Sequence, residues 1–223
     1  MMQTSACTKI DAYNGDPMPQ PKPTTTRGRP RTITREKIAD AGITIGLPHI
    51  TIVGMAAALG VSHMALYKHV PSLDALKNMV AEEIFSRWQL PQAVSPGQIT
   101  LQEYMTEFTD SVRVFVKTHP GVTPYVIRRL AATPAMLEKI NVHQNHIAQA
   151  YGISKEQSRW LLATVTFFSM SAADTVYSAA RLEPVIQADL AQEESEMEAE
   201  FEQGARALIA GALALVYQLP VEI

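Results

Sequence analysis

The 223-residue sequence predicts an all-α fold, and three observations lead to this prediction. Apolar residues recur every three or four positions in almost every segment from Thr34 onward, as on the buried face of a helix. Ser, Thr, Gly and Pro stand at the ends of these segments, where they cap or interrupt helices. No run of alternating apolar and polar residues bounded by turn residues indicates a strand.

The first 26 residues are expected to be a disordered, Pro-rich tail. They contain few large apolar groups, so burial cannot offset the entropy lost on ordering. The tail holds the only cysteine, Cys7, which excludes an internal disulfide and a zinc site built from several thiolates. Nothing resembles a secretory signal, and the uncharged apolar stretches are shorter than a membrane span of about 18 residues or more. We therefore expect a cytoplasmic protein without a membrane partner.

Positive charge is concentrated near the N-terminus. Residues 1–90 contain 10 Lys and Arg against 7 Asp and Glu, whereas residues 91–223 contain 9 against 15. Six of the basic residues stand between Lys22 and Lys37. Such a block is suited to binding a polyanion; the alternative is a solvated basic tail that binds no partner.

Four helices are expected between residues 34 and 90, followed by a break at Pro91, Pro96 and Gly97. Their predicted bounds are Thr34 to Ile45, a short helix after Thr51, Ser62 to about Val70, and Leu73 to about Trp88.

The second and third of these helices have the requirements of a helix-turn-helix. A small residue, Ala56, lets two helices cross closely, and Gly60 allows the left-handed turn between them. The start of the third helix, Ser62 to Ala65, can then enter a major groove, and the Tyr67 hydroxyl can meet a phosphate.

This segment resembles the tetracycline-repressor (TetR) family. The resemblance lies in Ala56, the Leu59-Gly60-Val61-Ser62 turn, the Leu66-Tyr67-Lys68-His69-Val70 string and Ser72-Leu73-Asp74-Ala75-Leu76. It implies that Tyr67 contacts the DNA backbone and His69 lies near the phosphates. The DNA-facing residues of the helix-turn-helix are then Thr51, Ser62, His63, Met64, Ala65, Tyr67, Lys68 and His69. Ile52, Val53 and Leu73 replace residues that are often polar or basic in the family, so this segment is poor in phosphate-binding cations.

The basic arm, residues 27–33, can supply the missing charge. Its sequence Arg27-Gly28-Arg29-Pro30-Arg31 resembles the AT-hook, which lies in the minor groove of A·T-rich DNA. Glycine lets the backbone approach the groove floor, proline keeps the chain extended, and the narrow groove attracts arginine.

Residues 99–223 are expected to form a ligand-binding and dimerisation domain, as the resemblance implies. The predicted helices are Leu101 to Thr118, Tyr125 to Ala132, Pro134 to Tyr151, Lys155 to Leu182 and Glu193 to Leu219. The stretch from Trp160 to Ala173 is apolar nearly all round and should be interior. Gly204 and Gly211 on the last helix allow a close partner helix. We expect the helices near 155–182 and 193–219 to form a four-helix homodimer interface; packing within one subunit is the alternative.

The ligand site is expected to be mostly apolar with few polar anchors. Candidate residues are Phe108, Phe115, Tyr125, Arg128, Arg129, His143, His146, Trp160 and Phe167. Family members that bind a magnesium-drug chelate use a histidine where Tyr125 aligns, which disfavours that ligand. No metal or cofactor is expected: His143 and His146 lack a third ligand nearby, and a solvated face explains the six glutamates from Glu193 to Glu202 better than a cation site does.

The sequence therefore indicates a ligand-responsive DNA-binding regulator and not an enzyme, because no catalytic constellation is present. We expect a homodimeric repressor whose reading helices lie about 34 Å apart on a pseudo-palindromic operator and which a small apolar or amphipathic inducer releases. The alternative is a partner-binding or ligand-buffering helical module with weakened DNA binding. The inducer, the operator and the regulated genes are not predicted.

Overall fold

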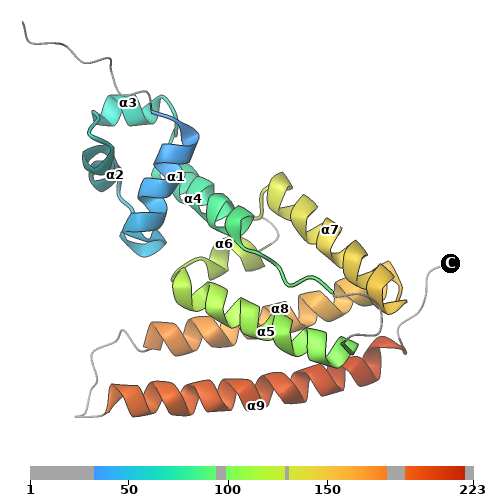
Figure 1. Ribbon diagram of the computed structural model, residues 1–223. Helices are drawn as coiled ribbons and strands as arrows, with labels where there is room; N and C mark the ends of the chain where they lie inside the picture. The colour runs from blue at the N-terminus through green and yellow to red at the C-terminus, as the bar shows by residue number, and fades with distance from the viewer. Residues whose placement is uncertain (1–32, 94–98, 129–130, 180–188, 219–223) are drawn as a thin grey trace, which may run out of the picture. The chain divides into compact units, whose positions relative to one another are not determined.

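The computed structural model describes residues 33–93, 99–128, 131–179 and 189–218, and all regular structure in these residues is helical. The all-α prediction is therefore confirmed. The elements are α1 Arg35–Ile45, the short 3-10 helix η1 Leu47–His49, α2 Ile52–Leu59, α3 His63–Tyr67, α4 Leu73–Arg87, α5 Leu101–Thr118, α6 Thr123–Ile127, α7 Pro134–Tyr151, α8 Lys155–Ala179 and α9 Leu190–Val216 (Figure 1).

Hydroxyl caps set the starts of the first four α-helices. The side chains of Thr34, Thr51, Ser62 and Ser72 each accept a backbone N–H from the first turn of the helix that follows. Each cap satisfies one of the amides that a helix start leaves without a partner. The predicted starts of these helices are confirmed.

Two helices differ from their predicted bounds. Helix α3 ends at Tyr67 and not near Val70, because the His69 amide bonds to the Leu66 carbonyl and tightens the last turn, and Pro71 has no amide to continue it. Helix α6 begins at Thr123, with Pro124 in its first turn, and ends at Ile127, because Arg128 is extended. The predicted helix over Tyr125 to Ala132 is therefore wrong in both bounds.

The last helix begins earlier than predicted. Asp189 caps it by accepting the amides of Ala191 and Gln192, so that α9 starts at Leu190 and not at Glu193. It ends at Val216. The predicted ends at Leu182 and Leu219 lie outside the described residues.

Helices α1, α2 and α3 form a head that packs on α4 (Figure 1). Their shared core includes Ile38, Met55 and Leu66, each fully buried. The ion pairs Arg35–Glu82 and Arg87–Asp40 join α1 to α4 at the surface.

Substitution of Gly42 by alanine should destabilise this head. A Cβ at Gly42 would collide with Cγ2 of Val80, which is fully buried on α4. Overpacking of this kind costs about 1 to 3 kcal/mol, measured as the loss in the free energy of unfolding. Val80→Ala should cost less in the Gly42→Ala background than alone, because it removes the colliding methyl groups. Additive costs in this double-mutant cycle would contradict the contact.

The remaining helices pack around α8, which contacts α5, α6, α7 and α9. The stretch from Trp160 to Ala173 buries one face, including Leu161, Val165 and Met170. Its other face is uncovered within the chain: Ala163 is exposed and Phe167 is 63% exposed. Within one chain this stretch is therefore interior on one face only, and its burial in a dimer interface stays a prediction.

Candidate DNA-binding and ligand-binding sites

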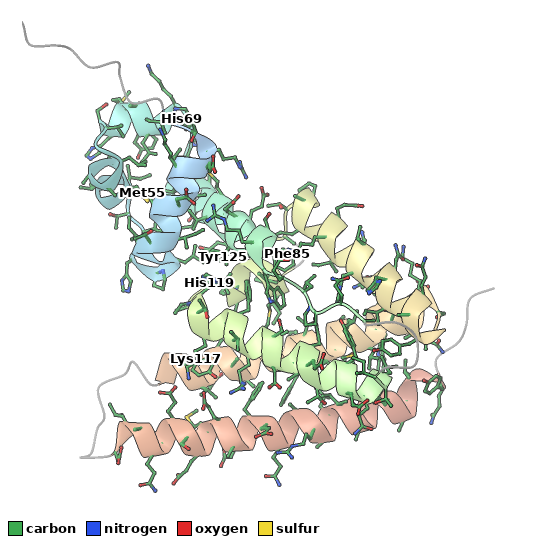
Figure 2. All side chains as sticks on the ribbon, in the orientation of Figure 1. Met55, His69, Phe85, Lys117, His119 and Tyr125 are labelled. Atoms are coloured by element: carbon green, nitrogen blue, oxygen red, sulfur yellow. The ribbon has the colours of Figure 1, made fainter. Side chains whose placement is uncertain are left out.

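The turn between α2 and α3 has the predicted left-handed glycine. Gly60 adopts φ 66° and ψ 38°, and the Val61 amide bonds to the Ala56 carbonyl at 3.0 Å. Ala56 is buried, so a larger side chain there would separate the helices. Figure 2 shows Met55 inside the head and His69 beside α3. This geometry is that of a helix-turn-helix.

Most of the candidate DNA-facing residues of the helix-turn-helix are exposed. Thr51, Ser62, His63, Met64, Tyr67, Lys68 and His69 are all exposed. Ala65 is half-buried, so it is partly turned away from this surface. Met64 is 72% exposed and Tyr67 45%, so both side chains are accessible to a partner.

This surface is short of cations, as the sequence predicts. Residues 33–90 contain five Lys and Arg against five Asp and Glu, so the head and α4 together have no excess of positive charge. Arg35 and Arg87 are engaged with carboxylates of α4 and α1, and Lys68 is the cation next to the reading helix. The predicted arm residues Arg27, Gly28, Arg29, Pro30 and Arg31 lie outside the described residues.

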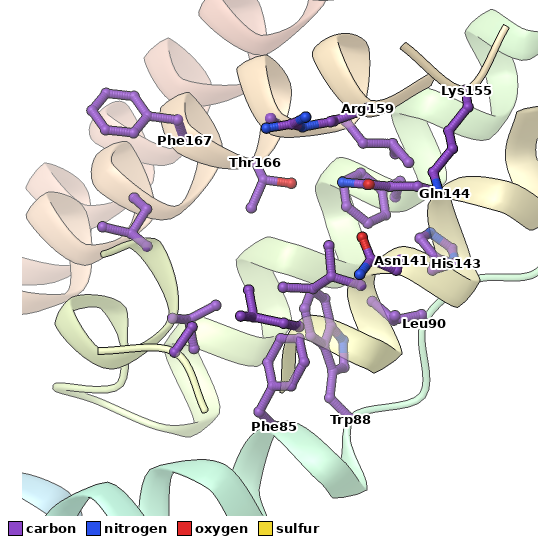
Figure 3. A pocket seen from close by; sticks show the side chains of 18 of the residues that line it. Phe85, Trp88, Leu90, Asn141, His143, Gln144, Lys155, Arg159, Thr166 and Phe167 are labelled. Carbon is purple, nitrogen blue, oxygen red and sulfur yellow. The ribbon is translucent and has the colours of Figure 1, made fainter. Parts of the chain in front are cut away.

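A cavity of about 790 Å³ lies between the end of α4 and helices α5, α6, α7 and α8. Figure 3 shows Phe85 and Trp88 on one side of it and Gln144, Arg159 and Thr166 on another. Its lining is Phe85, Trp88, Leu90, Phe108, Val126, Ile127, Ala132, Leu137, Ile140, Asn141, His143, Gln144, Lys155, Glu156, Arg159, Leu162, Ala163, Thr166 and Phe167. The volume and the mixed lining suit a small organic molecule.

Three predicted ligand residues line the cavity: Phe108, His143 and Phe167. The predictions for Phe115, Tyr125, Arg128, His146 and Trp160 are not supported by the lining, and Arg129 lies outside the described residues. Phe115 is buried against Trp88, with ring centroids 4.3 Å apart. His146 accepts the Ala93 amide at 3.1 Å. Phe115 thus supports the cavity residue Trp88 from behind, and neither Phe115 nor His146 lines the cavity.

The sequence analysis missed the part that α4 plays in the cavity. Phe85 and Trp88 line it from the last turn and end of that helix. The sequence signal was present, since the apolar stripe of α4 runs to Trp88, past the region that contacts the head. Gln144 and Arg159 were also missed, because a polar residue on a helix has no pattern that distinguishes a cavity from solvent.

His143 forms a buried pair with Tyr104. The Tyr104 hydroxyl lies 2.8 Å from His143 Nε2 and 3.3 Å from the Pro91 carbonyl. Burial lowers the pKa of His143 to about 4, with smaller contributions from the charges of His146 and Lys139. Burial also raises the pKa of Tyr104. Both groups are therefore neutral near pH 7, and His143 brings no charge to the cavity.

The acidic run of α9 pairs with protein cations. Lys117 of α5 lies 3.0 Å from both Glu194 and Glu198, and Tyr177 donates to Glu198 at 2.9 Å. These bonds lower the pKa of Glu198 and raise that of Lys117 to about 12. Figure 2 shows Lys117 between α5 and α9. In the described part of the chain, no group of three or more His, Cys, Asp and Glu could hold a metal ion.

Lys139 of α7 binds the end of α4, where the cavity meets the connecting helix. Its ammonium donates to the carbonyls of Phe85, Ser86 and Trp88 at 3.0, 2.7 and 2.6 Å. Burial lowers the pKa of Lys139. The Lys139 ammonium thus forms hydrogen bonds with three carbonyls at the C-terminus of α4, where the helix carries a partial negative charge.

A second contact links the helices around the cavity to the head. Gly121, in the turn between α5 and α6, has φ 79°, and a Cβ there would lie 3.1 Å from Pro48 Cγ of η1. Val122 and Leu47 beside them are buried. The described residues therefore connect the cavity to the head at α4 and at this turn.

The two predicted interface glycines differ. A Cβ at Gly204 would lie 3.2 Å from Phe168 Cζ in the same chain, so this glycine serves packing within the subunit. Gly211 has no neighbour within 4 Å of an added Cβ among the described residues. Ala207, Ala210 and Ala214 beside it are exposed, and Leu215 is 51% exposed. A surface of small and apolar residues thus faces outward on α9.

No protein family profile matches the sequence, and no curated protein sequence does. Solved structures do match. A variant of TetR from Acinetobacter baumannii AYE, in complex with minocycline, is 19% identical, with a TM-score of 0.63 over 83% of this chain and 99% of that chain. Apo ActR from Streptomyces coelicolor is 19% identical, with a TM-score of 0.63 over 83% and 98%. ActR in complex with actinorhodin is 20% identical, with a TM-score of 0.60 over 83% and 99%.

These matches cover nearly the whole length of each solved chain. The sequence resemblance pointed to the same family from the head alone. None of the helices in the described residues is long and apolar enough to cross a membrane. The chain has the fold of the TetR-family transcription regulators.

Proposed function

We propose that this protein is a cytoplasmic, homodimeric, DNA-binding transcription regulator, and not an enzyme, whose operator affinity responds to a small molecule in the cavity. The observation that carries the proposal is the shared helix α4: it packs against α1 of the head and places Phe85 and Trp88 on the cavity. A ligand that binds more tightly to one position of α4 than to another would favour that position and so move the head, formed by α1, α2 and α3, relative to the DNA. We propose that the protein represses its genes and that binding of an inducer relieves this repression.

The dimer is proposed to form through the exposed faces of α8 and α9. A second copy of the chain would cover Phe167 and the small residues around Gly211, which are otherwise exposed apolar surface. Two heads could then occupy successive major grooves of a pseudo-palindromic site, about 34 Å apart. TetR and ActR structures with bound minocycline and actinorhodin support a ligand site in a protein of this fold.

A gel-shift assay on DNA flanking the gene tests DNA binding, with the full chain and a chain lacking residues 1–33. The full chain should shift the DNA at low salt. Truncation should weaken binding and reduce the slope of log affinity against log salt by about one for each lost phosphate contact. No shift by the intact dimer would contradict the regulator proposal, and an unchanged salt slope would contradict the role of Arg27, Arg29 and Arg31.

Tyr67→Phe is expected to weaken binding to every DNA sequence by a similar factor. The exposed hydroxyl is proposed to donate to a phosphate, and such contacts carry no base information. Loss of a hydrogen bond to a charged group costs about 1.5 to 3 kcal/mol, or roughly tenfold to a hundredfold in affinity. Competition binding with operator variants measures preference; a changed preference would point to base contact instead.

A partner-binding or ligand-buffering module is the second candidate. It is favoured by the scarcity of cations on the helix-turn-helix surface and by exposed Val53 beside Thr51. This candidate predicts ligand binding to the cavity with no DNA shift at any salt concentration, so the same assay separates the two.

A further inference from the structure

Gln144 is a buried polar side chain whose amide has no partner. The residue is 7% exposed and lines the cavity from α7. Its backbone carbonyl accepts the Ser158 hydroxyl at 2.8 Å, but no hydrogen bond joins its side-chain amide to another residue of the described part. Figure 3 shows this side chain projecting from α7 into the space beside Arg159 and Asn141. The amide therefore faces the cavity with its hydrogen-bonding capacity unused within the described chain, so a polar group of a ligand can bind to it.

The polar side of the cavity has an excess of positive charge. Lys155 and Arg159 of α8 line it, against one carboxylate, Glu156, and a neutral His143. No ion pair joins Arg159 to any carboxylate of the described residues, unlike Arg87, Arg113 and Arg206. The planar Arg159 guanidinium can bind a carboxylate through two parallel hydrogen bonds.

The opposite side of the cavity is aromatic and held in place. The Trp88 indole donates to Ser111 at 3.0 Å and stacks on Phe115, with ring planes 18° apart. Phe85 and Phe108 flank Trp88 and also line the cavity. A flat ring system can lie against this wall with little rearrangement, since the wall side chains are already ordered by their own contacts.

We propose that the cavity binds a planar aromatic acid, with its rings against Trp88 and Phe85 and its anionic group on Arg159 and Gln144. This inference rests on the proposed function for its biological meaning, but the binding itself needs only the cavity. Arg159 is exposed, so water solvates its charge in the absence of a ligand, and a neutral aromatic molecule would lack the bidentate contact that an anionic group gains. The anionic group therefore distinguishes the proposed ligands from neutral aromatic molecules.

Two fluorescent probes with the same carbon skeleton test this. Anilinonaphthalene sulfonate carries the anionic group, and phenylnaphthylamine lacks it. The full-length protein should bind the sulfonate about tenfold or more tightly than the neutral probe. Arg159→Gln should remove most of this difference by weakening sulfonate binding, with little change for the neutral probe. Gln144→Leu should also weaken sulfonate binding selectively.

Two further variants locate the effect. Arg206→Gln removes a guanidinium from the exposed surface of α9, away from the cavity, and should leave both affinities unchanged. Ile140→Trp fills the cavity and should weaken both probes. Equal affinity of the two probes, an Arg206→Gln effect as large as that of Arg159→Gln, or unchanged binding to Ile140→Trp would each overturn the proposal.

The outcomes separate this inference from the proposed function. Probe affinities are measured without DNA, whereas addition of the sulfonate to the shifted DNA complex tests regulation. Arg159-dependent binding without release of DNA would support the ligand class and contradict regulation by this cavity. Release of DNA by the neutral probe and not by the sulfonate would support regulation by the cavity and contradict the proposal that its ligand is an aromatic acid.

Discussion

Replacement of Gly211 by glutamate is expected to turn the proposed dimer into a monomer of 24.5 kDa. The glycine has no neighbour within 4 Å of an added Cβ in the described part of its own chain, so the substitution does not disturb the subunit. Glutamate also favours a helix interior over glycine by roughly 0.5 to 1 kcal/mol. In the proposed interface, however, each subunit would bring a carboxylate without a partner into a buried apolar surface. Sedimentation velocity measures the change in mass.

The same variant should lose operator affinity by about a hundredfold or more, because two linked heads bind a palindrome with a high effective concentration and a single head does not. Gly211→Ala is the matched control, since it adds one methyl group and keeps the surface small; it should remain dimeric. A Gly211→Glu protein that sediments as a dimer would contradict an interface at this part of α9.

Replacement of Lys139 by methionine is expected to destabilise the junction between α4 and α7. Methionine keeps a long apolar side chain but removes three hydrogen bonds to the carbonyls at the end of α4. The loss of these bonds and of the favourable charge at a helix C-terminus should cost about 2 kcal/mol. For a protein of this size that corresponds to a fall in melting temperature of about 4 to 8 °C.

Lys77→Met is the control, because it makes the same chemical change on α4 at a lysine with no ion pair to another described residue. Hydrogen exchange adds a local measurement: amides in the last turn of α4 should exchange faster in Lys139→Met and not in Lys77→Met. Equal melting temperatures for the two variants would show that Lys139 does not hold α4.

The helix-turn-helix was predictable because its signals are local. A capping hydroxyl, a left-handed glycine and a small residue at a crossing each act within a few residues of chain, and Thr51, Gly60 and Ala56 occupy the predicted places. The errors arose where local signals compete. At the end of α3 the tightened turn before Pro71 ended the helix early, and at α6 an extended Arg128 ended a helix that the apolar pattern would continue.

The ligand cavity was only partly predictable. Phe108, His143 and Phe167 were expected, but Phe115 was expected as well and instead supports Trp88 from behind. An aromatic residue on a buried helix face has the same sequence pattern whether it meets a cavity or another side chain. Only the packing of α5 against the end of α4 separates these two cases.

By itself, the sequence predicted the all-α fold, the starts of the first four α-helices, the turn geometry of the head and the family whose fold the chain has, because caps, glycines and apolar periodicity act over short distances. The tertiary structure decided three further points. It placed Trp88 of α4 in the cavity, directed Gly204 inward and Gly211 outward, and left the Gln144 amide without a partner in the described chain. Each of these depends on which helices meet, and that is set by the summed burial of many side chains and not by any one segment.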